Sequence, residues 1–439
     1  MAGRPTTARA LDVWFNDQRV GRWSVHERSG HSFRYDALWL QSPLARPLSW
    51  RLPLVGGSRR HSGSVVSQFF EQLLPAAPAQ RLKLQLRAGS IDATAFELLG
   101  VLGRDCVGAV SLLPPDQTPG DVQQVQADGL DPGVLGALLD DCVSPSDAPP
   151  RSPVAARAVL PGRRAKLALM WHAGRWCLPR GATPTTHVLK LALGAQPGAA
   201  EAAGTSLENE WLCARLLAAY GFDVAPVRLE AVAGRRVLVS ERFDRRWLDG
   251  RWWARLPAHS FQQAAAPARQ GEVAAPMRFA HMLDLLRASE QPARDRERLF
   301  MAVVLGWMLG ATDRTAAQFS VLLKAGGSLS LAPLQGFLSA WPILGRTPKA
   351  SSIGRLHLAL PPVESSGPVR HDAMSRRQWL DAARRLSLGA EITSVLDGLA
   401  AWTPQAIDRV TGELPTAFPA SVAESIFAGL KRSAVALTH

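Results

Sequence analysis

The sequence predicts an α+β fold in which a small N-terminal α/β subdomain is followed by a larger, two-lobed domain. Three observations lead to this prediction. The chain has 439 residues, which is enough for two domains. A polar, proline-rich segment at residues 144–153 is typical of a linker. Beyond that segment, strand-like patterns come first and helical patterns follow, the order expected for two lobes with a cleft between them.

The N-terminal subdomain is predicted at residues 1–115, where strand and helix patterns form one small mixed unit. The first strand pattern is a hairpin that turns at Asn16-Asp17. Two segments have helical spacing, and Ser64 is the expected N-cap of the first. The predicted strands lie within residues 11–25, 31–35, 48–54 and 107–113, and the predicted helices within residues 64–74 and 95–102.

A connector at residues 116–153 contains a helix within residues 130–143 and the linker. The second domain, residues 154–439, is predicted to begin with a strand-rich N-lobe at about 154–257. Its expected hairpins turn at Ala173-Gly174 and Ala233-Gly234. A helix at residues 206–220 should begin at the N-cap Ser206 and end at Gly221. The predicted strands are residues 166–171, 175–178 and 187–193, with two more within 227–240.

The C-lobe, at about 276–439, is predicted to be mainly helical, because the apolar residues there recur at helical spacing. The expected helices are residues 282–288, 295–309, 376–386, 390–401 and 421–437.

Composition limits the classes of function. The net charge of +13 favours an acidic partner (nucleic acid, an acidic protein or a phosphate ligand), although a solvated arginine-rich surface would give the same charge. The four cysteines are far apart, which argues against a zinc site or a disulfide scaffold. No signal-peptide core is present at the start, and the longest apolar run, residues 300–311, is too short to span a membrane. We therefore expect a cytoplasmic protein without membrane contact.

One stretch, residues 310–320, has the layout of a catalytic loop. It follows the apolar run at residues 299–309, so that Asp313 stands where a buried element ends and a loop begins. A second segment, residues 331–343, should fold back beside it. Together they resemble the catalytic loop and the metal loop of a phosphotransferase.

Motifs along nearly the whole chain carry a resemblance to a known family. In the first domain they are N-D-Q-R-V-G (16–21), A-R-P-L-S (45–49), F-F-E-Q-L-L-P (69–75) and G-R-D-C-V-G-A-V (103–110). In the second they are T-P-T-T-H-V-L-K (183–190), N-E (209–210), E-R-F-D-R-R-W (241–247), G-A-T-D (310–313) and L-P-T-A-F-P (414–419). The chain resembles the HipA family, the bacterial serine/threonine kinase toxins of type II toxin–antitoxin modules. The resemblance implies that the second domain is a two-lobed, protein-kinase-like (HipA-like) domain.

The resemblance also implies roles for the retained residues. Asp313 matches the base that orients and deprotonates the substrate hydroxyl, while Gly162, Lys166 and Lys190 match nucleotide-binding positions near the phosphates. Glu241 and Phe243 match the hinge that holds adenine. Other interpretations stay open: Asp313 as a cap or salt-bridge partner, Lys190 as a solvated lysine, Phe243 as core, Asn209 and Glu210 as structural, and Arg163-Arg164 as a phosphate contact or a solvated turn.

Most of the catalytic positions depart from the family pattern. The magnesium-binding asparagine is replaced by Gln318 and the metal-binding aspartate by Gly336, while the histidine and lysine of the catalytic loop are Thr315 and Ala317. The serine that such toxins phosphorylate to switch themselves off is Val159. An acidic pair is absent from residues 259–263. Because Mg²⁺ needs oxygen ligands with at least one carboxylate, we expect Mg²⁺ binding to be lost and ATP to bind weakly or without metal dependence.

These departures predict a catalytically inactive pseudokinase of a toxin–antitoxin-type system that acts through protein or protein–DNA binding. Its expected partner is a helix-turn-helix antitoxin-like protein or another HipA-like subunit, with indirect DNA contact. The alternative is an active ATP-dependent serine/threonine kinase toxin that phosphorylates a protein of the translation machinery. That alternative requires a rearranged metal site, for which Asp284 or Glu241 could supply a carboxylate.

Overall fold

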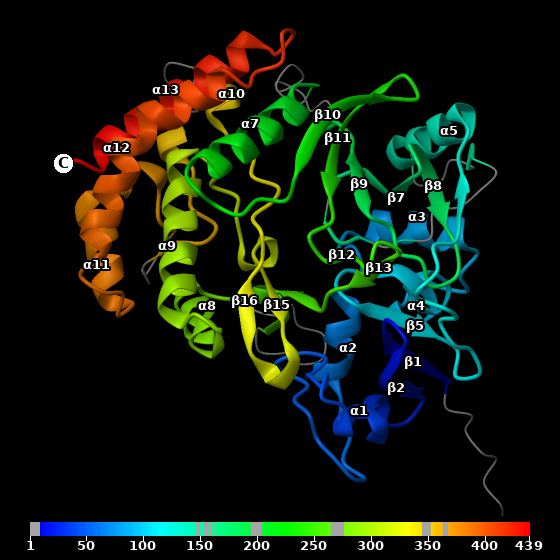
Figure 1. The fold of residues 1–439 in the computed structure, drawn as a ribbon. Helices are drawn as coiled ribbons and strands as arrows, with labels where there is room; N and C mark the ends of the chain where they lie inside the picture. Colours follow the sequence, from blue (N-terminus) through cyan, green and yellow to red (C-terminus); the bar gives the residue numbers. More distant parts are fainter. Residues whose placement is uncertain are drawn as a thin grey trace, which may run out of the picture.

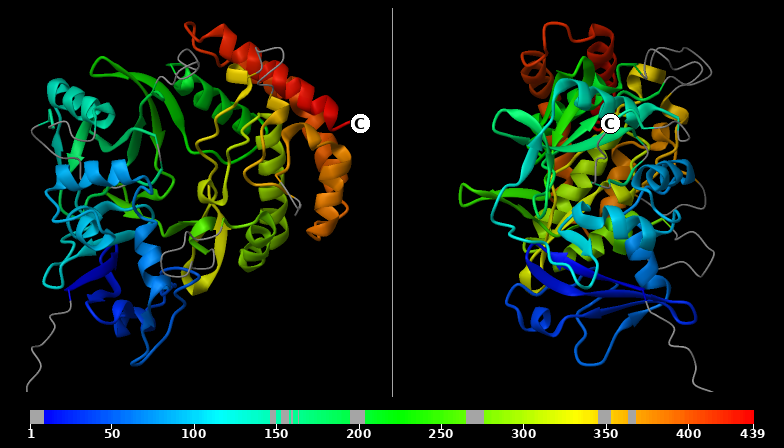
Figure 2. Two further views of the ribbon diagram at one scale, coloured as in Figure 1. Left: turned by 180° about the vertical axis from the view of Figure 1, so that it is seen from behind. Right: turned by 90° about the vertical axis from the view of Figure 1, so that its right-hand side faces the viewer.

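The computed structural model describes residues 9–145, 150–152, 158, 160–162, 164–194, 204–264, 276–344, 353–362 and 368–439. The predicted fold class is confirmed: an N-terminal α/β subdomain precedes a strand-rich lobe and a helical lobe (Figure 1). Two further views show the subdomain (blue to cyan) at one end of the molecule and the C-terminal helices (red) at the other (Figure 2).

The subdomain is built on a five-stranded antiparallel sheet with the order β4-β3-β2-β1-β5. The hairpin predicted at Asn16 is present, and Asn16 adopts the positive φ of 53° that such a tight turn requires. Trp23 and Phe70 stack in the core with their ring centroids 3.8 Å apart. The strands are β1 (Arg9–Phe15), β2 (Gln18–His26), β3 (Gly30–Tyr35), β4 (His61–Ser62) and β5 (Val110–Leu113), and the helices are α1 (Ala37–Gln41), α2 (Ser64–Glu71), α3 (Pro78–Ala88) and α4 (Ala95–Leu102).

The strand-rich lobe is a six-stranded sheet, in the order β10-β11-β9-β7-β8-β6, with a helix on each face. Because side chains alternate along a strand, Val237 and Val239 of β11 pack with α5, whereas Leu238 joins the core that contains α7. The elements are β6 (Ala127–Gly129), α5 (Pro132–Val143), β7 (Lys166–His172), β8 (Arg175–Pro179), β9 (His187–Lys190), α7 (Ser206–Ala219), β10 (Val227–Val232) and β11 (Arg235–Glu241). Both predicted turns are present, at Ala173-Gly174 and Ala233-Gly234, all four residues having positive φ.

The remainder is mainly helical, with two small sheets at its junction with the other parts. One is the β12–β13 hairpin, and the other has the order β14-β15-β16. The strands are β12 (Arg245–Leu248), β13 (Trp252–Arg255), β14 (Ala258–Ser260), β15 (Ser320–Leu323) and β16 (Leu329–Leu331), and the helices are α8 (Phe279–Leu285), α9 (Pro292–Met308), α10 (Trp341–Leu344), α11 (Arg376–Arg385), α12 (Ile392–Thr411) and α13 (Ala420–Ala436). No helix in the described ranges is long and apolar enough to cross a membrane.

Several local predictions are wrong. Residues 48–54 form a tight turn closed by an isolated Ser49–Leu52 bridge instead of a strand, because the Tyr35 hydroxyl bonds the Leu48 amide and the Leu52 carbonyl. The N-cap of α2 is Gly63 instead of Ser64. The N-cap of α7 is Thr205, and Ser206 is the first residue of the helix, where its hydroxyl accepts a hydrogen bond from the Leu193 amide.

Further predicted ranges differ from the observed elements, and the helix expected at residues 390–401 continues to Thr411 as α12. The strand expected at residues 187–193 ends at Lys190. The connector at residues 116–153 contributes β6 and α5 to the second sheet, and part of its linker lies outside the described residues.

Candidate functional site

A buried ion pair joins the strand-rich lobe to its helix. Lys190 stands at the end of β9, and its Nζ lies 2.5 Å from Oε1 of Glu210 on α7. Arg164 binds the other oxygen of the same carboxylate. Burial would raise the pKa of Glu210, but the charges of Lys190 and Arg164 outweigh it and hold the pKa below its ordinary value. An ion pair between a strand lysine and a helix glutamate is one of the features that protein kinases need in place.

The ion pair answers questions that the sequence left open. Lys190 is a partner of Glu210 and is not a solvated lysine. Arg164 also binds the Leu191 carbonyl at 2.7 Å, which excludes a fully solvated turn at this residue. Asn209, one residue before Glu210, exchanges two 2.8 Å hydrogen bonds with the backbone of Ser339 and therefore anchors the second loop to α7.

Gly162 and Lys166 lie beside this ion pair. Lys166 Nζ donates to the Pro161 carbonyl, and burial together with the charges of Lys190 and Arg164 lowers the pKa of Lys166 to about 8. Gly162 has φ 103°, which favours glycine, and a Cβ there would lie 2.8 Å from Lys166 Nζ. Val159 and Arg163 lie outside the described residues.

The predicted catalytic loop and metal loop lie side by side, as expected from the sequence. The Ala340 amide bonds the Gly310 carbonyl at 3.1 Å. Asp313 is exposed at the surface of this pair of loops, and it has no hydrogen-bond or ion-pair partner among the residues that the structure describes. The alternative role of Asp313 as a cap or a salt-bridge partner is therefore not seen within those residues.

Thr315 and Gln318 form a local capping arrangement. The Gln318 side-chain oxygen accepts from the Thr315 amide at 2.6 Å, and the Gln318 amide donates to the Thr315 carbonyl at 3.0 Å. With the Thr315 side chain also accepting from the Gln318 amide, both halves of the capping box that the pattern T-x-x-Q specifies are present, so the signal was in the sequence. Ala317, between them, is exposed. The oxygen of Gln318 is thus bonded within its own loop.

Arg314 ties the two loops together, a role that the sequence analysis missed. Its Nη1 donates to the carbonyls of Gln335 and Gly336 at 3.0 and 2.9 Å, and its Nη2 donates to the Gln318 carbonyl at 2.9 Å. Its guanidinium lies 3.8 Å from the ring centroid of Phe337. Gly336 has φ 69°, and a Cβ there would lie 3.8 Å from Arg314 Nη1. A buried cation therefore adjoins the position at which the family resemblance implies a metal-binding aspartate.

The two residues predicted to form the hinge have different surroundings. Glu241 is paired with His187 in the β9–β11 register, so both side chains lie on the face opposite to that of Lys190. On that face Glu241 lines a cavity of about 550 Å³ together with His187, Arg228 and Trp253. Phe243 is half-buried and belongs to none of the core clusters in the described part of the chain, so the interpretation as simple core is not supported.

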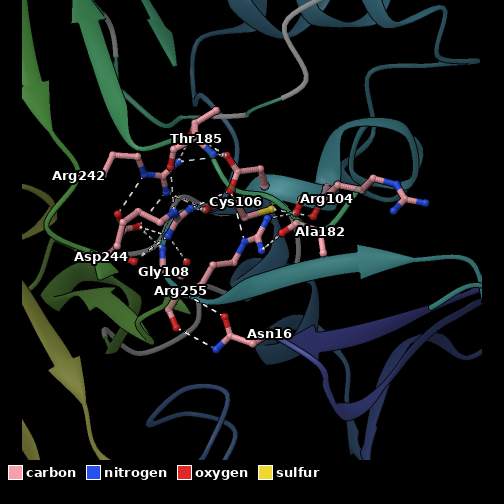
Figure 3. Close-up of polar contacts among 12 residues, drawn as sticks. Asn16, Arg104, Cys106, Gly108, Ala182, Thr185, Arg242, Asp244 and Arg255 are labelled. Atoms are coloured by element: carbon pink, nitrogen blue, oxygen red, sulfur yellow. Dashed lines mark hydrogen bonds and ion pairs between the residues drawn. The ribbon is translucent and has the colours of Figure 1, made fainter. Parts of the chain in front are cut away.

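Most of the charged residues in the E-R-F-D-R-R-W motif form an interdomain cluster (Figure 3). Asp105 of the N-terminal subdomain accepts from Arg245 at 2.8 Å and from the Thr185 hydroxyl at 2.6 Å. Asp244 accepts from Arg242 at 2.8 Å and from the Gly108 amide at 2.7 Å. Burial alone would raise the pKa of Asp105, but the arginines hold that pKa well below its usual range. This motif therefore joins the subdomain to the second domain.

The next question is which side chains of the described residues could serve as metal ligands. Among the described residues, no group of three or more His, Cys, Asp or Glu side chains is placed to hold a metal ion. The two carboxylates considered for a rearranged site are engaged or directed elsewhere: Asp284 is exposed and pairs with Arg287 at 3.1 Å, and Glu241 faces the cavity described above.

The HipA N-terminal domain model matches residues 11–113, and the HipA-like C-terminal domain model matches residues 158–407. The chain is 32% identical over 422 residues to Y4mE of Sinorhizobium fredii, a protein named as a candidate kinase, with 92% of each protein covered. It is 25% identical to the serine/threonine-protein kinase toxin HipA of Shewanella oneidensis, over 55% of this chain and 51% of that protein. A HipA structure from Shewanella oneidensis was solved with HipB and operator DNA. It matches this chain with a TM-score of 0.74 at 19% identity, and the match covers 97% of this chain and 96% of the HipA chain.

Proposed function

This chain belongs to the HipA family, and from that premise we propose that it is a catalytically inactive member of a toxin–antitoxin-type system that acts by binding. Family membership implies a kinase-like fold. Within that fold, the residues at the positions implied to bind metal, Gln318 and Gly336, have changed.

One observation carries the proposal: the positions that would hold Mg²⁺ are committed to holding the loops together. The oxygen of Gln318 bonds Thr315, and the carbonyl of Gly336 bonds Arg314. Mg²⁺ requires near-octahedral oxygen ligands, and a buried guanidinium beside the site repels a dication. Losing the metal should cost several kcal/mol of transition-state stabilisation, at about 1.4 kcal/mol per tenfold in rate.

ATP fits the site better than the metal does. Lys166, Lys190 and Arg164 gather three positive charges around the single carboxylate of Glu210, which leaves a net positive site for phosphates. We expect ATP to bind weakly or without dependence on Mg²⁺. The residues that would hold the phosphates are Lys190 and Lys166, with Gly162 allowing the close approach of the chain.

The expected partner is a helix-turn-helix antitoxin-like protein or a second HipA-like subunit, through which the complex would reach DNA. Support comes from the net charge of +13 and from the similar HipA structure, which was solved with HipB and operator DNA. Co-purification with a DNA-bound partner that weakens steeply with salt would agree with this assignment. A pull-down without such a partner would count against it.

A phosphotransfer assay tests the proposal. The purified chain is incubated with labelled ATP, Mg²⁺ or Mn²⁺ and candidate protein substrates, beside an Asp313→Asn variant as control. We expect no incorporation above the level of the control. Phosphate transfer that depends on Asp313 would overturn the proposal.

The alternative, an active serine/threonine kinase toxin acting on the translation machinery, is favoured by two observations. The Lys190–Glu210 ion pair is formed, and Asp313 is unengaged within the described residues. The same assay decides between the two functions, because only the alternative predicts transfer that is lost in the Asp313→Asn variant.

A further inference from the structure

A small pocket lies behind the two loops, on the side of the helical lobe. Its wall includes Val303 and Gly306 of α9, Phe337 of the second loop and Trp379 of α11, and Arg314 also lines it. The pocket offers about 20 Å³ to the centre of a water-sized particle. That space suits one or two such particles and excludes a nucleotide or a phosphate-bearing metabolite.

Two residues of this wall carry buried N–H groups that lack partners in the described part of the chain. Arg314 is 5% exposed and its Nε has no hydrogen-bond acceptor among the described residues; Trp379 is 0% exposed, and the same holds for its Nε1. A buried polar group without a partner is costly, and native structures satisfy nearly all of them. Trp307, which also lines the pocket, shows the usual situation: its Nε1 donates to the His371 carbonyl at 2.9 Å.

The charge of Arg314 is only partly offset by its surroundings, in which the nearby carboxylates are those of Asp313 and Glu210. Within the described ranges it forms no ion pair, and its other donors bind neutral carbonyls of Gln318, Gln335 and Gly336. Burial lowers the pKa of Arg314 to about 10, so the guanidinium remains charged at neutral pH. A buried charge is normally paired with an opposite charge.

The orphan groups identify the chemistry of an occupant. Both Arg314 Nε and Trp379 Nε1 are donors only, so the occupant must accept at least two hydrogen bonds. An anion accepts these hydrogen bonds and also offsets the positive charge of Arg314. A water molecule would accept the hydrogen bonds but would not offset the charge. Thr312 supplies the hydroxyl of the described wall, and a hydroxyl can donate as well.

From this geometry we propose that the pocket is a binding site for a single small inorganic anion, of the size and charge of chloride, held by Arg314 Nε and Trp379 Nε1. The anion completes the coordination of the side chain that ties the catalytic-type loop to the metal-type loop. Its binding therefore stabilises the pair of loops. The site is separate from the phosphate site at Lys190 and does not depend on the proposed function.

Bromide, which replaces chloride and scatters anomalously, gives a direct test with the wild-type chain. Crystals of the full chain are grown or soaked in sodium bromide. The expected result is an anomalous peak within hydrogen-bond distance of both nitrogens. Density at this position without an anomalous signal would mean bound water, and an empty pocket would mean no ligand; either result overturns the proposal.

A second measurement follows the linkage in solution. At constant ionic strength, replacing sodium gluconate by sodium chloride should raise the Tm in a saturable way, by about 1–3 °C. Trp379→Phe removes one donor and should weaken chloride binding by tenfold or more. Trp307→Phe is the matched control, because it removes an indole N–H of the same pocket that already has a partner. A chloride response that is absent in the wild type, or unchanged in Trp379→Phe, contradicts the site.

Discussion

Replacing Glu210 by glutamine should destabilise the protein by about 3 kcal/mol. The Glu210 side chain is 3% exposed and is shared by Lys190 and Arg164, whose side chains are 13% and 11% exposed. Glutamine preserves the shape but carries no charge, so two buried cations lose their counter-charge. Removing one partner of a buried ion pair costs about 3–5 kcal/mol, and the remaining amide oxygen, which still accepts a hydrogen bond, places the expected value at the lower end.

Calorimetry converts this free energy into a shift of Tm. At about 2.1 cal/mol/K per residue, a chain of 439 residues has an unfolding entropy of about 0.9 kcal/mol/K, so Glu210→Gln should lower the Tm by about 3 °C. Glu413→Gln is the control, because the Arg215–Glu413 pair is 38% and 28% exposed and such pairs contribute about 0–1 kcal/mol. If both variants shift the Tm equally, the buried ion pair does not hold α7 against β9, and the reasoning fails.

Three further predictions use the same frame. The double variant Gly336→Asp and Gln318→Asn should gain a thermal stabilisation by Mg²⁺–ATP over ATP alone, which the wild type should lack; equal shifts in both proteins would show that more than the ligands has been lost. Burial lowers the pKa of His259 to about 4 from about 6.5, so stability should be complete above pH 6.5 and fall by about 3 kcal/mol towards pH 4, as measured by urea midpoints. His259→Phe should remove only part of the total histidine effect, because the pKa values of His187, His31 and His371 are also lowered, and an unchanged profile would contradict this. Asp105→Asn should cost about 3–5 kcal/mol and speed proteolysis between the subdomain and the second domain; resistance equal to that of the wild type would show that the cluster does not join them.

The parts of the fold that sequence could predict are those with local causes. Turns at Asn16, Ala173-Gly174 and Ala233-Gly234 were predictable because short polar or glycine-containing pairs between apolar runs require positive φ. Residues 48–54 were predicted wrongly, because their conformation is set by the hydroxyl of Tyr35, which is distant in sequence. Local patterns carry no information about such a partner.

In the candidate site, too, the features with local causes could be predicted and those that depend on distant partners could not. The adjacency of residues 310–320 and 331–343 was predictable from an apolar run that ends at a loop. The position of Arg314 between the two loops was not, because its partners are backbone carbonyls, which leave no residue pattern. In the sequence, Glu210 stands out only as part of a motif. Its role as the partner of Lys190 depends on how β9 and α7 pack together, which the sequence does not show.

The changed positions lie outside the two buried ion-pair clusters of this structure. The subdomain is held by Asp105, Asp244 and their arginines, and α7 by Glu210 with Lys190 and Arg164. Neither set includes a metal position. Where a changed residue does contribute to stability, as Gln318 does by bonding Thr315, it does so in a way that a metal ligand could not, because its oxygen is already used. The frame can therefore lose its metal chemistry without losing its fold, which is the condition that a family member acting by binding must satisfy.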